Sequence, residues 1–305
     1  MSEMTSETGV NRLASVFVLI GLVTLAAAGC TRAAGDVTAD AVAAEKIREK
    51  LLVKAAAEGD ATAEASGAGP AGYASLKGQF LLGAGTVEIK LLDVNRDHEV
   101  CAPGGQMPRD PSLKVDDATR GISDIVVFAR RTKHKHESAV KPDEPEVVFD
   151  QKACLFLSPA FVAQVGQTVQ VKNSDPVGHN TNIQGTGFNQ IIPVNESRSF
   201  EVKAQAEAPK EVGCNVHPWM KAYMWFRKDG YYAVTKKDGS FEIANLPAGE
   251  QIEFQAWHAR ARGGLALAVP ELKWDAKGRF RVTLEPDAPK DLGKLEVPAS
   301  ALAGG

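Results

Sequence analysis

The chain has 305 residues, of which 44% are hydrophobic and 24% charged, and its formal net charge is −3 at pH 7. This length is enough for two modest domains with flanking tails, and the composition is ordinary for a globular protein. Because the charge is nearly balanced, no basic surface for nucleic acid is expected, and we predict no nucleic-acid partner.

The N-terminal stretch is predicted to export the chain. Residues 14–28 form an apolar run of about fifteen residues, shorter than the ~20 that a membrane-spanning helix needs, so the run is typical of a signal peptide. It ends in Ala27-Ala28-Gly29-Cys30, which resembles a bacterial lipobox. The resemblance implies a signal peptide over residues 1–29, lipidation of Cys30 and a lipid anchor on the periplasmic side of a bacterial membrane. Thr31 stands where an inner-membrane signal has aspartate, which favours the outer membrane. An ordinary secretory signal and a short uncleaved anchor are the alternatives, and both also export the protein.

Residues 30–73 are predicted to be a disordered or partly helical tether. They are rich in Ala, Glu, Gly and Thr and contain too few apolar side chains to build a core. Within them, residues 41–57 favour a helix, because Ile47, Leu51 and Leu52 share one side.

From residue 74 onwards the pattern predicts an all-β body. Short runs rich in Val, Ile, Phe and Thr alternate with Gly, Pro, Asn and Asp at strand spacing, and helical periodicity is scarce. Over residues 74–148 two opening strands are expected, at 76–82 and 122–129. His134 and His136 follow in the run 133–136, where flanking lysines favour an exposed basic loop over surface metal capture.

Potential metal ligands gather in the next segment. Cys214, His217 and Met220 form a C-x2-H-x2-M pattern, and Asn173-Ser174-Asp175 and His179-Asn180 precede them. A thiolate, imidazoles and a thioether are the donors that suit copper alternating between Cu(I) and Cu(II).

This pattern resembles the ligand set of the cupredoxins, with a short ligand loop of the amicyanin/plastocyanin type. The resemblance implies a Greek-key β-sandwich over residues 149–228 and one type 1 copper bound by His179, Cys214, His217 and Met220. It also implies that Asn180 holds the ligand loop and supports a hydrogen bond to the thiolate. Met224 is the competing axial ligand, but its spacing favours a place in the core.

Three strong ligands and one weak one leave no open position for a substrate. Electron transfer is therefore favoured over catalysis, and no catalytic residue is predicted. In the cupredoxins the loop imidazole reaches the surface, so the resemblance implies an electron-transfer port at His217, Pro218 and Trp219. It also implies a redox protein partner such as a cytochrome or a dehydrogenase. Burial of Trp219 in the core is the alternative.

The remaining cysteines are expected to be bonded to each other. With Cys30 assigned to lipid and Cys214 to copper, Cys101 and Cys154 are left in an oxidising compartment, where a disulfide is expected. Two unpaired core thiols, or a second metal site using His98 and Cys101, are the alternatives.

The C-terminal part resembles the later half of a carboxypeptidase regulatory-like (transthyretin-like) β-sandwich, in which an Asp-Gly turn joins two strands. The segments that carry the resemblance are 231–235, 237–243, 246–249 and 254–258. It implies a small sandwich over residues 229–298, followed by a tail at 299–305. The opening strands of such a sandwich are absent directly upstream. We therefore hypothesise that residues 74–148 supply them and that the copper domain is inserted into a split sandwich. Trp257 and His258 are expected to pack at a strand end.

Two other functions stay open at this point. One is a copper carrier or storage lipoprotein, with the same ligands and no redox partner. The other is a carbohydrate-interacting module associated with polysaccharide lyases, which rests on fold analogy alone. A cupredoxin-like domain that has lost its metal is disfavoured, because all four ligand residues are present.

Overall fold

The computed structural model describes residues 69–261 and 264–304. The expected signal peptide, Cys30 and the expected helix of the tether lie outside the described residues. Within that part of the chain, no helix has both the length and the apolar character needed to cross a membrane.

The described chain is all-β, as the sequence predicts. Its strands are β1 (Tyr73–Leu82), β2 (Val126–Arg131), β3 (Glu146–Lys152), β4 (Leu155–Phe156), β5 (Ala160–Gln164), β6 (Thr168–Asn173), β7 (His179–Ile183), β8 (Phe188–Ile192), β9 (Ser197–Glu201), β10 (Lys210–Gly213), β11 (Lys221–Arg227), β12 (Tyr232–Val234), β13 (Ser240–Pro247), β14 (Gln251–Trp257), β15 (Arg279–Thr283) and β16 (Lys290–Val297). Short helices connect some of them: α2 (His98–Cys101), α3 (Glu137–Val140), and 3-10 turns at Pro103–Gly105, Pro270–Leu272 and Ala299–Leu302.

Alternating side chains and one glycine turn explain the C-terminal strands. In β14, Ile252, Phe254 and Ala256 are buried, and the residues between them are at least partly exposed, which is the two-residue period of a pleated strand. Before β13, Gly239 has φ +81°, and a Cβ there would lie 2.1 Å from the carbonyl oxygen of Phe80. Only glycine fits this turn, because it combines the left-handed backbone with the close approach of β1.

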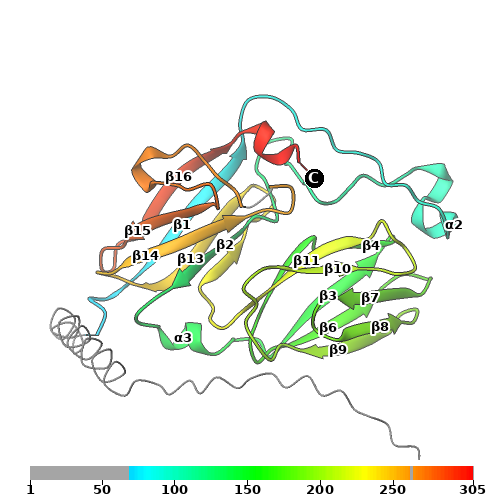
Figure 1. The fold of residues 1–305 in the computed structure, drawn as a ribbon, viewed down its shortest axis with the longest axis horizontal. Helices are drawn as coiled ribbons and strands as arrows, with labels where there is room; N and C mark the ends of the chain where they lie inside the picture. The colour runs from blue at the N-terminus through cyan, green and yellow to red at the C-terminus, as the bar shows by residue number, and fades with distance from the viewer. Residues whose placement is uncertain (1–68, 262–263, 305) are drawn as a thin grey trace, which may run out of the picture. The chain divides into compact units, whose positions relative to one another are not determined.

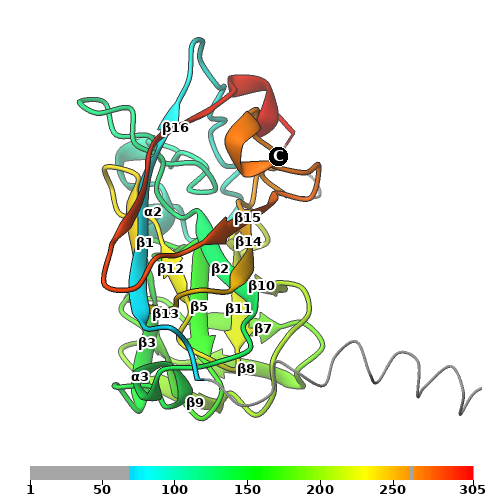
Figure 2. The same cartoon turned by 90° about the vertical axis from the view of Figure 1, so that its left-hand side faces the viewer.

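The strands β1 and β2 pair with strands from the far end of the chain. β1 lies between β13, to which it is antiparallel, and β16, to which it is parallel. β2 lies between β12 and β14 and is antiparallel to both. Figures 1 and 2 both show β1, in cyan, alongside the red β16. β1 and β2 therefore pair with strands that follow β11, and we call the segment between β2 and β12 the inserted segment.

The inserted segment forms a second sandwich. One sheet has the order β5-β11-β10-β7-β8, and the other has the order β4-β3-β6-β9. Parallel pairs, β5 with β11 and β3 with β6, stand among antiparallel ones. The two sheets enclose a core that includes Phe149, Val171 and Met224, so Met224 takes the core position expected of it.

Aromatic side chains pack where the two sandwiches meet. The ring centroids of Phe128 and Trp225 lie 4.9 Å apart, and those of Trp225 and Trp257 lie 5.8 Å apart. Trp257 is therefore a packing residue, as expected. His134 and His136 are partly exposed, and Nδ1 of His136 accepts a hydrogen bond from the backbone nitrogen of Ser138 at 3.2 Å, which caps the start of α3.

Cys101 and Cys154 form the predicted disulfide. The bond ties α2 to the turn between β3 and β4. His98 is exposed, and the sulfur of Cys101 is already bonded, so a second metal site using these two residues is excluded.

Replacing Cys101 and Cys154 together by serine should lower the free energy of unfolding by about 4 kcal/mol. The reason is that the bond closes a loop whose ends are 53 residues apart in the sequence, which restricts the unfolded chain. Urea denaturation followed by circular dichroism measures the difference. An unfolding midpoint equal to that of the wild type would contradict the expectation.

His258 makes the stability of the protein depend on pH. Its side chain is fully buried after β14, and burial lowers its pKa to about 4, with the charge of Arg260 acting in the same direction. In the unfolded chain the same ring titrates at 6.5. The stability contributed by the neutral ring is therefore present above pH 6.5 and is lost as the pH falls to about 4, because only the unfolded chain binds the proton in this range.

Between these pH values the wild type should lose on the order of 3 kcal/mol more unfolding free energy than His258→Gln. Denaturant titrations of both proteins at several pH values measure this difference, and the comparison cancels the other titrating groups. Parallel pH profiles for the two proteins would show that the ring is not held neutral.

Candidate metal centre

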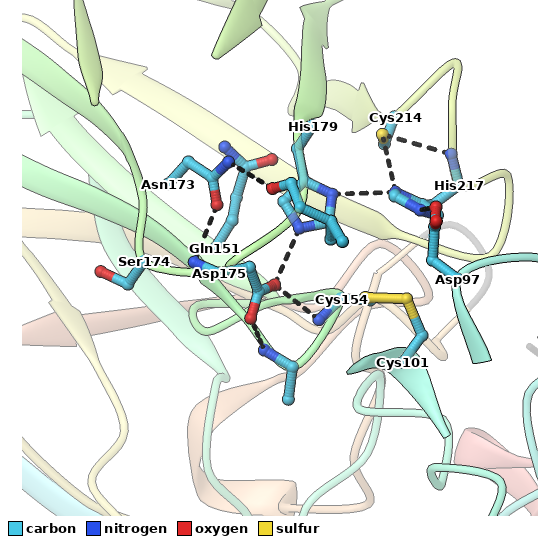
Figure 3. Close-up of polar contacts among 12 residues, drawn as sticks. Asp97, Cys101, Gln151, Cys154, Asn173, Ser174, Asp175, His179, Cys214 and His217 are labelled. Carbon is cyan, nitrogen blue, oxygen red and sulfur yellow. Dashed lines mark hydrogen bonds and ion pairs between the residues drawn. A yellow bond between two sulfur atoms is a disulfide. The ribbon is translucent and has the colours of Figure 1, made fainter. Parts of the chain in front are cut away.

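The inserted sandwich brings three metal-binding side chains to one end. β7 begins at His179, and the loop between β10 and β11 carries Cys214 and His217. Because β10 pairs with both β7 and β11, the loop lies beside the start of β7. Potential ligand atoms of these three residues lie within 4.8 Å of one another, and all three side chains are buried. Figure 3 shows them converging.

Asn173 holds the turn that leads into β7. Its side-chain amide donates to the carbonyl oxygens of Val177 at 2.8 Å and Ile192 at 3.0 Å, and its Oδ1 accepts from the backbone nitrogen of Asp175 at 2.9 Å. A side-chain amide that satisfies backbone groups in this way fixes the course of a turn. The position of His179 at the start of β7 follows from it.

Backbone amides point at the sulfur of Cys214. The backbone nitrogens of Asn180 and His217 each lie 3.3 Å from Sγ. Burial raises the pKa of this thiol, but hydrogen bonds from His179 and from backbone amides outweigh it, and the pKa lies below its ordinary value. Asn180 also ties the ligand loop, because its Oδ1 accepts from the backbone nitrogen of Asn215 at 3.2 Å.

Each imidazole is held by a carboxylate from outside the ligand loop. Nε2 of His179 lies 2.8 Å from Oδ2 of Asp175, and Nε2 of His217 lies 2.8 Å from Oδ2 of Asp97. An ionised carboxylate only accepts hydrogen bonds, so each Nε2 carries a proton. In the neutral tautomer this leaves Nδ1 of each ring with its lone pair free for a metal.

The two Nδ1 atoms face each other. They lie 2.8 Å apart, and Nδ1 of His217 lies 3.8 Å from Sγ of Cys214. Two nitrogen lone pairs at this distance repel each other unless a cation, either a proton or a metal ion, lies between or beside them. The protein thus builds a buried position that attracts a cation, next to a thiol whose pKa lies below its ordinary value.

The pKa of His179 is raised and that of His217 is lowered, which is the pattern expected when the two rings share one proton. Burial lowers the pKa of His179, but its hydrogen bond to Asp175 and its contact with Cys214 outweigh burial and raise the pKa to about 9. Burial lowers the pKa of His217; Asp97 opposes this shift, and the charge of His179 adds to it. A metal ion that enters between the rings must therefore displace a proton.

The rest of the ligand loop packs beside Cys214 and His217. Met220 is buried in the core cluster that contains Cys214, and its backbone carbonyl accepts from the nitrogen of Cys214 at 3.3 Å. Trp219 is half-buried. Its ring centroid lies 5.0 Å from that of His217, and its Nε1 donates to the carbonyl oxygen of Cys154 at 3.1 Å.

His217 does not reach the surface, contrary to the expectation from the resemblance. Its side chain is 0% exposed, and Asp97 covers Nε2. The reason is that part of the connection between β1 and β2, tied down by the disulfide, lies over the ligand loop. The expectation of an exposed imidazole port is wrong. Pro218 is exposed and Trp219 is half-buried, so these two side chains carry the accessible surface of the loop beside the ring.

Sequence reasoning missed the two carboxylates. Asp175 belongs to the Asn173-Ser174-Asp175 motif, but the motif alone indicates no role for its carboxylate. Asp175 lies four residues before His179 and pairs with it. That spacing was the available signal. Asp97 lies 120 residues before His217 in the chain, and no local pattern links the two. The sulfur atoms of the disulfide also lie near His217, but because they are bonded to each other they offer no thiolate.

No family model matches the chain, and no curated protein matches it. Among solved structures, amicyanin from Paracoccus versutus is 18% identical, and the match covers 33% of this chain and 97% of that one with a TM-score of 0.25. A variant of amicyanin in the reduced Cu(I) form at pH 4 is also 18% identical, over 33% of this chain and 98% of that one, with a TM-score of 0.25. An oxidised amicyanin variant is 19% identical over 27% of this chain and 83% of that one, again with a TM-score of 0.25. At these scores the likenesses carry no functional weight.

Replacing Asp175 by asparagine should lower the pKa of His179 from about 9 towards its ordinary value of 6.5, because the ring loses the carboxylate that stabilises its protonated form. NMR titration of the imidazole in the metal-free protein measures the pKa. Asp150→Asn is the matched control, since Asp150 contacts Ser174 and Lys172, whereas the carboxylate that holds the ring of His179 is that of Asp175. An unchanged pKa in Asp175→Asn would show that the carboxylate does not hold the proton on the ring.

Proposed function

We propose that this chain binds one copper ion in a type 1 site and transfers electrons to or from a redox protein partner. The observation that carries the proposal is the pair of Nδ1 atoms 2.8 Å apart beside the sulfur of Cys214. Two imidazoles and a thiolate are the donor set that suits copper in electron-transfer sites.

Under this proposal Nδ1 of His179, Sγ of Cys214 and Nδ1 of His217 would hold the ion, and the thioether of Met220 would be a weaker fourth ligand. A copper ion held there supplies one-electron exchange between Cu(I) and Cu(II). The donors present fit this ion, because the thiol already has a lowered pKa and both rings are oriented with Nδ1 inward.

The surrounding residues hold the donors rigidly. Asn173 fixes the turn before β7, the backbone amides of Asn180 and His217 point at the sulfur, and carboxylates hold both rings. All three donors are buried, which keeps water and small substrates away from them. A closed, preorganised set of ligands supports electron transfer over chemistry on a bound substrate.

The cellular setting is proposed from the sequence alone. Under this proposal the residues after the signal peptide tether the two sandwiches to a lipid on Cys30, on the periplasmic side of a bacterial membrane and preferably the outer one. The partner, a cytochrome or a dehydrogenase, then meets the loop at Trp219 and Pro218, because the edge of His217 is covered.

Copper titration of the full chain tests the proposed function. We expect one Cu(II) per chain, an intense visible thiolate-to-copper band, an EPR signal with a small copper hyperfine splitting, and reversible reduction. Cys214→Ser should abolish the visible band, because the band requires the thiolate. Copper that binds without such a band and passes to a chelator on reduction would instead identify a carrier. Failure of the wild type to bind copper would contradict the proposed function.

Two methionine variants test whether Met220 is the fourth ligand in the same experiment. Met220→Leu should change the EPR spectrum and raise the reduction potential, because the thioether donor is lost. Met224→Leu is the matched control, since Met224 lies in the core and the exchange nearly conserves volume. Equal spectra for Met220→Leu and the wild type would remove Met220 from the ligand set.

A further inference from the structure

The connection between β1 and β2 contains a segment that belongs to the core of the inserted sandwich. We define residues 92–107 as the cap. Val94, Cys101 and Ala102 are buried in the same cluster as Cys214, and Leu92, Val100 and Met107 pack against that cluster. Although β1 and β2 pair with the C-terminal strands, the cap between them therefore completes the core around the metal centre.

The cap is tied to the metal centre through Cys154. The disulfide joins Cys101 of α2 to Cys154. The backbone nitrogen of Cys154 donates to Oδ2 of Asp175 at 2.8 Å, and its carbonyl oxygen accepts from Trp219 at 3.1 Å. One residue thus connects the cap, the carboxylate that holds His179, and the ligand loop.

The backbone of Asp97 directs its carboxylate towards His217. Asp97 has φ 50° and ψ 38°, in the left-handed region that few residues other than glycine adopt and that aspartate tolerates better than most. Its carbonyl oxygen accepts from the backbone nitrogens of Val100 at 3.0 Å and Cys101 at 2.9 Å, so α2 begins here. From this position its Oδ2 reaches Nε2 of His217 at 2.8 Å. The Asp97 side chain is 42% exposed and the His217 side chain 0%, so the carboxylate lies between the buried ring and solvent. Figure 3 shows the contact between the two side chains.

We propose that Asp97 is the positioning residue for His217, and that the cap carrying it closes the metal centre. Asp97 accepts a hydrogen bond from the protonated Nε2 of His217. This bond selects both the tautomer and the ring orientation in which Nδ1 faces Cys214 and His179. Without this acceptor the ring can rotate about its bond to Cβ, which moves Nδ1 away from the other donors. A carboxylate that orients a metal-binding imidazole in this way commonly controls metal affinity.

The inference rests on the proposed function for its metal-bound consequences, but its first test needs no metal. In the metal-free full chain, the Nε2 proton of His217 should give an NMR signal protected from exchange with water, because it is buried and bonded to Asp97. Asp97→Ala and Asp97→Gly should lose this signal. Using both separates the loss of the carboxylate from backbone strain, because glycine adopts the left-handed region freely. Asp93→Asn, an exposed residue of the same cap, is the matched control and should keep the signal.

The second test uses copper. Asp97→Ala and Asp97→Gly should lower the affinity for Cu(II) by about 10- to 100-fold and change the EPR spectrum at saturating copper. Asp97→Asn, which keeps an acceptor oxygen and loses the charge, should fall between them and the wild type. Alkylation of Cys214, followed by mass spectrometry of its peptide, should be faster in Asp97→Ala and Asp97→Gly, because the reagent can then reach the sulfur from solvent.

The outcomes separate the two proposals. If the wild type binds no copper, the proposed function fails, and the protected proton still decides the role of Asp97. If the protected NMR signal of the His217 Nε2 proton is absent in the wild type or persists in Asp97→Gly, the positioning role is overturned. It is also overturned if Asp97→Gly binds copper with the affinity and EPR spectrum of the wild type.

Discussion

The structure depends on two imidazole rings that turn their Nδ1 atoms towards each other while a carboxylate holds the opposite nitrogen of each ring. The 2.8 Å between these nitrogens is stable only when a cation neutralises the repulsion of their lone pairs. The sulfur of Cys214, with backbone amides directed at it, adds a third donor. The turn held by Asn173 and the packing of the ligand loop serve to keep these atoms in place.

The topology of the chain supplies the two carboxylates from different places. Asp175 comes from the turn before β7, inside the inserted sandwich, and Asp97 comes from the connection between β1 and β2. The strands that flank this connection pair with the C-terminal strands. The insertion thus lets a segment anchored on one sandwich close the centre of the other, and the disulfide holds that segment down. A consequence is that the loop imidazole is buried, and a partner must meet the site beside it.

Local patterns predicted the parts of the protein that local forces determine. The strand-forming runs, the Asp-Gly turn and the close spacing of Cys214 and His217 all depend on a few neighbouring residues, so the sequence alone predicts them. It does not predict the role of Asp97 or the burial of His217. Both arise from contacts across 120 residues, and exposure depends on what covers a side chain, which no short pattern encodes. The disulfide was predictable because few cysteines remained to be paired.

X-ray absorption at the copper edge of the full chain, loaded with one copper ion, tests the central claim most directly. If the two imidazoles and Cys214 converge on one ion, the spectrum must show two nitrogen ligands and one short bond to sulfur. The sulfur contribution must disappear in Cys214→Ser. A spectrum of the wild type that contains only oxygen and nitrogen ligands would contradict the account, because the facing rings would then serve to hold a proton and not a metal.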